Sequence, residues 1–332
     1  MLGSKKYSWV NLIIHRFKEY TLKGIVELTQ KNNGDSIFED DWRNLIILDD
    51  CRYDIFKSEY IKRRLPGRLE YKISKGSWTG EFLLKNFTDK KYDDIIYITA
   101  NPFVDKYLKG KFYKVISVWK NGWNERYNTV PPNKVYEQTI KTLKKYPNKR
   151  FVVHFLQPHH PYFSLQNFED NAMNIIKNSV EKNHSMSLSG FPKEPLHSIY
   201  LSEIYAYFSL SKLIRAYIEN LRIVLPYVEL LLHYLPGRTI ITSDHGEIFG
   251  KPVTKLLPIK VYGHGIGRIP DLVKVPWLIF EEEDKPKLRP IKDIKKDIAR
   301  IEKRYMLHES SKQKELKKIK RAISQLKLKQ KI

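Results

Sequence analysis

Short apolar runs that end in polar residues recur along this chain, and they predict an α/β fold. The clearest is Leu45–Leu48, which is too short for a helix and suits a strand buried on both faces. Similar runs predict strands at 94–100, 151–156, 239–242 and 275–280. Helical spacing predicts helices at 52–63, 135–146 and 204–235, the last with a break at Pro226, and loops are expected at 164–198 and 250–262. This alternation is typical of a mostly parallel sheet flanked by helices.

Metal-ligand types of residue follow two of these predicted strands. Asp49 and Asp50 come directly after the first strand, and Asp244 and His245 follow the strand at 239–242. The carboxyl ends of parallel strands face the ligand crevice, and adjacent acids there are costly unless a cation lies between them. Carboxylates with a neutral imidazole are good ligands for zinc or manganese. The alternative is that the acids begin a loop and cap a helix.

Both ends of the chain are predicted to form basic helices. Residues 7–30 have apolar positions at helical spacing among lysines, which suits either packing on the domain or attachment to anionic lipid. The C-terminal tail, residues 285–332, carries 18 Lys and Arg residues and 5 Asp and Glu residues. It also has two runs in which apolar residues lie three and four positions apart, as in a helix. This tail either packs on the domain or forms an arm that mediates oligomerisation or binds an anionic surface. The predicted domains are 1–36, 37–284 and 285–332.

The overall charge predicts an anionic partner. The formal net charge is +23 over 332 residues, which points to a membrane surface, a nucleic acid or an anionic polymer. Nucleic acid is the least favoured of these, because few aromatic residues interleave the lysines of the tail. The single cysteine, Cys51, excludes an internal disulfide and fits a small buried residue. No signal-peptide pattern and no apolar run of spanning length is recognised, so a cytoplasmic protein is predicted, with attachment to the inner membrane face left open.

Five short motifs, in order, resemble those of the alkaline phosphatase superfamily, specifically its sulfatase-like branch. The resemblance extends from about Trp42 to Phe280. The motifs are Leu48-Asp49-Asp50, Gly76-Ser77-Trp78-Thr79-Gly80-Glu81-Phe82, Gln157-Pro158-His159-His160-Pro161-Tyr162, Thr242-Ser243-Asp244-His245-Gly246-Glu247, and Tyr262-Gly263-His264-Gly265 followed by Val275-Pro276-Trp277. The resemblance implies a three-layer α/β/α sandwich, with the basic helical tail as an addition.

The resemblance also implies an active site around one divalent metal. Asp49, Asp50, Asp244 and His245 would hold the metal, which would be Mn, Zn, Ca or Mg. Sulfatases proper use a cysteine matured to formylglycine, but Cys51 lacks that sequence context, so a hydroxyl nucleophile is implied. Ser77 and Thr79 are the two candidates, and each would lie at a helix N-terminus where an anion is favoured.

Three further residues complete the predicted site. His159 and His264 match histidines that face the transferred group in this family, where they can act as acid or hydrogen-bond donor. Arg52 either reaches the anionic substrate, pairs with Asp49 or lies at the surface. Two other polar residues are assigned structural roles: Asn101, before Pro102, is expected to form a turn, with substrate contact as the alternative, and His154 is expected to be a core histidine.

The implied activity is metal-dependent hydrolysis or transfer of a phosphate ester, with a sulfate ester less favoured. The anionic ester would be a glycan or a lipid headgroup. The alternative is a non-catalytic sulfatase-like protein that binds an anionic membrane or polymer and shows salt-dependent binding without turnover. A metal site for a nucleotide sugar ranks last, because it leaves Asp244, His245 and His264 without a role.

Overall fold

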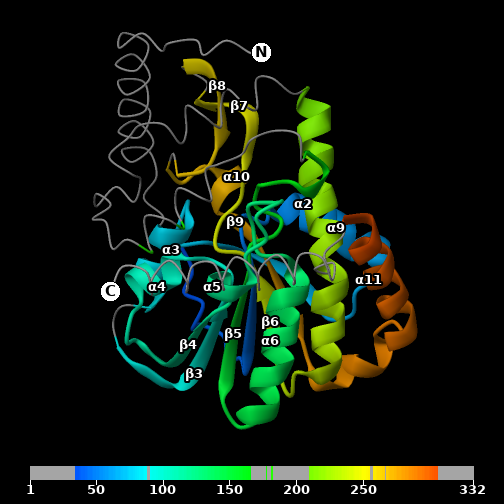
Figure 1. Cartoon of the computed structure of the whole chain (residues 1–332). Helices are drawn as coiled ribbons and strands as arrows, with labels where there is room; N and C mark the ends of the chain where they lie inside the picture. The colour runs from blue at the N-terminus through cyan, green and yellow to red at the C-terminus, as the bar shows by residue number, and fades with distance from the viewer. Residues whose placement is uncertain are drawn as a thin grey trace, which may run out of the picture. The chain divides into compact units, whose positions relative to one another are not determined.

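A seven-stranded, mostly parallel sheet flanked by helices forms the centre of this computed structural model, which confirms the predicted fold class (Figure 1). The structure describes residues 34–87, 90–165, 177, 181, 209–254, 257–265 and 267–305. The chain divides into two compact units, Met1–Leu288 and Arg289–Ile332. The predicted helix at 7–30, the loop at 164–198 and the second helix of the tail lie wholly or mostly outside the described residues. The predicted domain boundaries stay predictions.

The strands and helices follow one another in the order expected of an α/β protein. The strands are β1 (Asn44–Leu48), β2 (Arg68–Ile73), β3 (Tyr92–Thr99), β4 (Phe112–Ser117), β5 (Arg150–Phe155), β6 (Thr239–Thr242), β7 (Ile248–Thr254), β8 (Leu257–Gly263) and β9 (Lys274–Phe280). The α-helices are α2 (Tyr53–Arg63), α3 (Thr79–Phe87), α4 (Phe103–Tyr107), α5 (Trp119–Gly122), α6 (Pro132–Lys145), α9 (Leu210–Tyr234), α10 (Pro270–Val273) and α11 (Ile291–Tyr305). Short 3₁₀ helices lie at Phe163–Leu165 and Glu282–Lys287.

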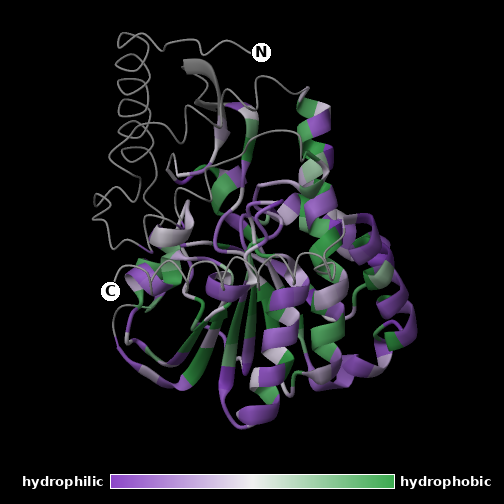
Figure 2. Cartoon of the chain, in the orientation of Figure 1, coloured by the Kyte–Doolittle hydropathy of each residue, from purple (hydrophilic) through white to green (hydrophobic). Residues whose placement is uncertain are grey.

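The order of the strands in the sheet is β2-β9-β6-β1-β5-β3-β4. Strands β6, β1, β5, β3 and β4 are parallel neighbours, whereas β9 pairs antiparallel with both β6 and β2. Every residue of β1 is buried, as its apolar run predicts. Figure 2 shows hydrophobic residues concentrated along the central strands, while α6 carries both hydrophobic and hydrophilic residues around its axis. Because β6, β1, β5 and β3 are parallel neighbours, their carboxyl ends lie side by side.

Helix α9 is continuous through Pro226, so the predicted break there is wrong. A proline lacks the N–H that would bond to the carbonyl four residues earlier, here that of Arg222. The guanidinium of Arg63 donates to this carbonyl over 3.3 Å, and it also pairs with Glu229 over 2.9 Å. Tertiary contacts from α2 thus replace the hydrogen bond that Pro226 removes.

The predicted loop at 250–262 is also wrong, because residues 250–254 and 257–262 belong to the antiparallel strands β7 and β8. A proline and several lysines in this segment suggested a loop. Pro252 lies in β7 next to an irregularity in the strand register, a place where a sheet tolerates proline. The hairpin connects the His245 segment to His264, so it places both histidines at one end of the sheet.

Candidate active site

The carboxyl ends of four neighbouring strands bring the predicted residues together. Asp49 and Asp50 follow β1, Asp244 and His245 follow β6, His159 follows β5, and Asn101 follows β3. Asp49, Asp50, Asp244 and His245 are all completely buried. Four parallel strand ends thus bring a cluster of buried polar residues to one edge of an otherwise apolar sheet.

The two oxygens of the Asp49 carboxylate have different surroundings. Its Oδ2 accepts a 2.6 Å hydrogen bond from Nδ2 of Asn101 and lies 3.6 Å from Nε2 of His154. Its Oδ1 has no hydrogen-bond partner among the described residues and lies 3.6 Å from Nε2 of His245. One oxygen is anchored, and the other is left for a further ligand.

Asp244 and His245 are anchored in the same one-sided way. Oδ1 of Asp244 accepts hydrogen bonds from the backbone N–H groups of Asp50 and His245, each over 3.0 Å. Its Oδ2 has no hydrogen-bond partner in the described part of the chain and lies 3.4 Å from Nε2 of His245. Nδ1 of His245 donates to the carbonyl of Gly246 over 3.0 Å, which leaves Nε2 unprotonated in the neutral ring.

In this cluster, neighbouring charges shift the pKa values of His245 and Asp244 in the direction opposite to the effect of burial. Burial alone would lower the pKa of His245, but the carboxylates of Asp244 and Asp49 outweigh it and raise that pKa. Burial likewise would raise the pKa of Asp244, but His245 and His154 lower it. The carboxylate of Asp244 is therefore held in the ionised form that binds a cation.

Thr79 and Ser77 differ in what their hydroxyls contact. Oγ1 of Thr79, the first residue of α3, lies 3.4 Å from Nε2 of His245 and 3.4 Å from Nδ2 of Asn101. The hydroxyl of Ser77 instead donates to Glu81 over 3.0 Å, and the Ser77 backbone N–H donates to the same carboxylate oxygen over 2.8 Å. We call Asp49, Asp244 and His245 the ligand cluster. The hydroxyl of Thr79 lies beside this cluster, whereas the hydroxyl of Ser77 contacts Glu81 of α3.

Three oxygen atoms of this site lie at the spacing from Nε2 of His245 that a tetrahedral divalent metal requires. The donors Asp49 Oδ1, Asp244 Oδ2 and Thr79 Oγ1 lie 3.4–3.6 Å from Nε2 of His245. Tetrahedral zinc with bonds of about 2.0–2.1 Å requires ligand atoms about 3.3 Å apart. Oδ1 of Asp49 and Oδ2 of Asp244, which both lie near Nε2 of His245, have no hydrogen-bond partner among the described residues. The other polar atom of Asp49, Asp244 and His245 is held by a hydrogen bond, which is usual for residues that bind a metal.

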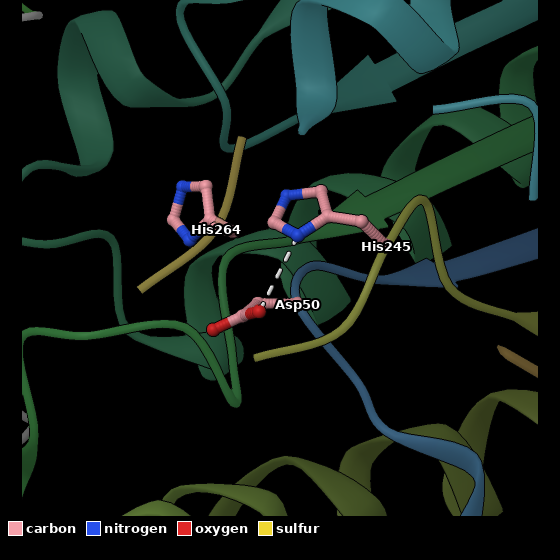
Figure 3. Close-up of side chains that lie close together, drawn as sticks. All are labelled: Asp50, His245 and His264. Atoms are coloured by element: carbon pink, nitrogen blue, oxygen red, sulfur yellow. Dashed lines mark ion pairs between the residues drawn. The ribbon is translucent and has the colours of Figure 1, made fainter. Parts of the chain in front are cut away.

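Asp50 does not join this set, although it is the neighbour of Asp49. Its backbone adopts a left-handed conformation, with φ of 66°, which turns its side chain away. Asp50 lies instead with His245 and His264, and its Oδ1 is 3.3 Å from Nδ1 of His245 (Figure 3). The two acids therefore face different groups of ligand-type residues, where one shared metal was predicted.

A second carboxylate, Glu247, belongs to the group around Asp50. Its Oε2 accepts a hydrogen bond from Nδ1 of His264 over 3.4 Å. Burial, together with the Glu247 carboxylate, holds the pKa of Asp50 well above its usual range. Burial alone would raise the pKa of Glu247, but Asp50 and His264 lower it to about 2. The two pKa shifts therefore favour a protonated Asp50 beside an ionised Glu247.

His159 and His264 lie together next to His245. The ring of His264 is centred 4.5 Å from that of His245 and 5.1 Å from that of His159. Burial and the neighbouring histidines lower the pKa of both His159 and His264. Nδ1 of His159 donates to the carbonyl of His160, and Nδ1 of His264 donates to Glu247. The neutral rings therefore present unprotonated Nε2 atoms, which accept protons.

Arg52 is close to the site, but its guanidinium is already bound by acids. It forms ion pairs with Asp54 over 2.7 Å and with Asp271 over 3.0 Å, and it donates to the carbonyl of Glu247 over 3.1 Å. Its side chain is 9% exposed. This geometry favours a structural role, in which Arg52 ties α2 to the segments around Glu247 and Asp271.

Replacing Arg52 with glutamine tests that role. We expect the free energy of unfolding to fall by about 2–3 kcal/mol, because charge-assisted hydrogen bonds are lost and Asp271 loses a partner. The KM for an anionic ester should change less than threefold. Urea unfolding and initial rates measure the two quantities, and Arg215→Gln, in the exposed first turns of α9, is the control. A large rise in KM without loss of stability would restore Arg52 to substrate binding.

Three residues of the site were not assigned a functional place from the sequence. Asn101 does form the predicted turn, since its Oδ1 accepts from the N–H of Phe103, but its Nδ2 also holds Asp49. His154 is a buried core histidine that also faces Asp49, and Glu247 faces His264. Each position follows a strand or lies near its end, which is the signal that could have identified them.

The chain is similar in fold to several solved structures. No protein-family model and no curated protein matches it. The soluble domain of lipooligosaccharide phosphoethanolamine transferase A from Neisseria meningitidis matches with a TM-score of 0.45 and 10% identity, over 80% of this chain and 84% of that one. The C-terminal periplasmic domain of EcEptC from Escherichia coli, in complex with Zn, matches with a TM-score of 0.43 and 12% identity, over 77% of each chain.

A protein in the alkaline phosphatase superfamily from Vibrio parahaemolyticus is also similar, with a TM-score of 0.34 and 11% identity, over 80% of this chain and 70% of that one.

The predicted cytoplasmic location is contradicted by the same comparison. The similar structures include periplasmic domains and an integral membrane protein, so the expectation of a cytoplasmic protein is wrong. Within the described residues, no helix has the length and apolar character that crossing a membrane requires.

Proposed function

We propose that this protein transfers or hydrolyses a phosphate ester through Thr79, with a divalent metal held by Asp49, Asp244 and His245. One observation carries the proposal: one oxygen each of Asp49, Asp244 and Thr79 lies 3.4–3.6 Å from Nε2 of His245, and each carboxylate and the imidazole is anchored through its other polar atom. The metal, when bound, would supply positive charge that favours the ionised hydroxyl of Thr79 and neutralises a phosphoryl oxygen.

Thr79 is the proposed nucleophile. Its Oγ1 would form a bond to phosphorus while the bond from phosphorus to the leaving oxygen breaks, which gives a phosphorylated threonine. Its position at the start of α3 adds free backbone N–H groups and the positive end of the helix dipole near the transferred group. Asn101 donates toward Oγ1 and Asp49, so it would hold the nucleophile in place.

His159 and His264 are proposed to carry the proton. In the second half of the reaction, water or an acceptor alcohol attacks phosphorus and gives its proton to an unprotonated Nε2, while the bond from phosphorus to Oγ1 breaks and leaves the ionised oxygen of Thr79. The same nitrogen then returns that proton to the leaving oxygen of the next substrate. Hydrolysis and transfer differ only in whether water or an alcohol occupies the acceptor position. An ester on a glycan or a lipid headgroup is the proposed substrate class.

A panel of chromogenic esters tests this function. We expect turnover of p-nitrophenyl phosphate or its bis-ester in the presence of Zn, Mn, Mg or Ca, and weaker turnover of the sulfate. Intact mass spectrometry should detect a covalent adduct on Thr79. Absence of turnover together with absence of metal binding in calorimetry would overturn the proposal in favour of a non-catalytic binding protein. Metal binding without turnover of any ester would contradict hydrolysis and leave transfer to an alcohol, tested by adding glycerol as acceptor.

A further inference from the structure

We propose that Tyr97 and His154 form a buried chain that orients Asp49 as a metal ligand, an inference that rests on the proposed function. The sheet register brings the three residues to one face. Ile47 pairs with His154, and Asp49 lies two residues beyond Ile47. Tyr97 pairs with Val152, two residues before His154. Because side chains alternate along a strand, residues two apart point to the same face.

The contacts run in a line from the core to the ligand cluster. The hydroxyl of Tyr97 lies 3.0 Å from Nδ1 of His154, and Nε2 of His154 lies 3.6 Å from Oδ2 of Asp49. All three side chains are fully buried, so bulk water does not screen them. At 3.6 Å the second contact is an electrostatic one, longer than a hydrogen bond.

The direction of the first hydrogen bond decides the role of His154. Burial, with the charges of Asp244 and Asp49, raises the pKa of Tyr97 well above its usual range, so its hydroxyl keeps its proton. If this hydroxyl donates to Nδ1, the proton of His154 resides on Nε2 and faces the Asp49 carboxylate. In the opposite arrangement, a lone pair of Nε2 would face that carboxylate and the buried hydroxyl proton would lack this acceptor, at a cost of about 1–3 kcal/mol.

This arrangement assigns His154 a positioning role rather than a place among the metal ligands. His154, Asp49 and Asp244 do lie close enough together to form a ligand group of their own. A histidine with its proton on Nε2 cannot bind a metal through that atom. Instead it attracts Oδ2 of Asp49, as Asn101 does, and leaves Oδ1 to face His245. Support of this kind typically changes metal affinity by 10- to 100-fold.

Calorimetric binding of Zn²⁺ and Mn²⁺ tests the chain without relying on turnover. His154→Phe, which keeps a ring but removes the donor, should weaken metal binding 10- to 100-fold. His154→Gln places an amide donor near the position of Nε2 and should stay within about fivefold of the unaltered protein. Tyr97→Phe removes only the hydroxyl and should weaken binding three- to tenfold. Tyr113→Phe, on the exposed part of β4, is the matched control and should change nothing.

The outcomes separate this inference from the proposed function. No metal binding by the unaltered protein would overturn both. Metal binding that is unchanged in His154→Phe and Tyr97→Phe would overturn the orienting chain alone. If His154→Gln loses as much affinity as His154→Phe while Tyr97→Phe loses none, His154 is a direct ligand and the proposed chain is wrong. Should His154→Phe fail to fold, His154→Gln and Tyr97→Phe still decide between these outcomes.

Discussion

Replacing Thr79 with valine is expected to reduce turnover by at least about 10³-fold, because the variant keeps the shape of the side chain but lacks the attacking oxygen. The covalent adduct should disappear from the mass spectrum. Thr79→Ser restores a hydroxyl on the same atom and should keep turnover within about tenfold. Initial rates at saturating metal measure both, and urea unfolding confirms that the variants are folded.

Ser77→Ala is the matched control for Thr79→Val. The Ser77 hydroxyl contacts Glu81 and not the ligand cluster, so turnover should fall less than tenfold. The loss should appear in the free energy of unfolding, by about 0.5–2 kcal/mol, since Ser77 and Glu81 together stabilise the start of α3. The reverse result, with turnover lost in Ser77→Ala and kept in Thr79→Val, would assign the nucleophile to Ser77.

Asp244→Asn is expected to weaken metal binding at least about 100-fold and also to lower the stability of the metal-free protein. The amide keeps an oxygen that can accept from the N–H groups of Asp50 and His245, but the anionic oxygen that faces Nε2 of His245 is lost. His245 and His154 lower the pKa of Asp244, so its ionised carboxylate stabilises the fold, and an uncharged amide loses this contribution even when no cation is present.

Thermal unfolding with and without metal measures this effect. At a metal concentration of 100 times Kd, the unaltered protein should gain about 2.7 kcal/mol, whereas the variant at that same concentration should gain less than about 0.5 kcal/mol. Asp105→Asn is a suitable control, because Asp105 binds Ser117 and Trp119 and has no place in the cluster. It should lose stability and keep its metal affinity. An Asp244→Asn protein that gains as much stability from metal as the unaltered protein would contradict the proposed ligand role.

The sequence pattern was sufficient to predict the central strands and the residues at their ends. The run Leu45–Leu48 and the acids after it are local features, and burial of β1 follows from its apolar character. The edge strand β2 was not predicted, because Arg68, Glu70 and Lys72 give it a polar pattern and much of it is exposed. Likewise, the break predicted at Pro226 ignored Arg63, whose contact with the Arg222 carbonyl depends on how α2 and α9 pack.

The choice between Ser77 and Thr79 also needed the structure. Both residues lie at the start of α3, and local sequence assigns either of them a capping or a nucleophilic role. Only the tertiary structure, which brings Oγ1 of Thr79 within 3.4 Å of Nε2 of His245, shows which hydroxyl approaches that histidine. The separation of Asp50 from Asp49 is a backbone property, since φ of 66° is rare for an aspartate and is not encoded by any pattern of apolar residues.

The pairing of β1 with β6 has a consequence for folding kinetics. Asn44 and Thr239, which begin the two strands, are hydrogen-bonded across a sequence separation of 195 residues. Contacts of such long range form slowly because a large loop must close first. Asp49 and Asp244 meet only when this pairing is complete, so a partly folded chain has no metal site. Metal should therefore slow unfolding while leaving the rate of refolding almost unchanged.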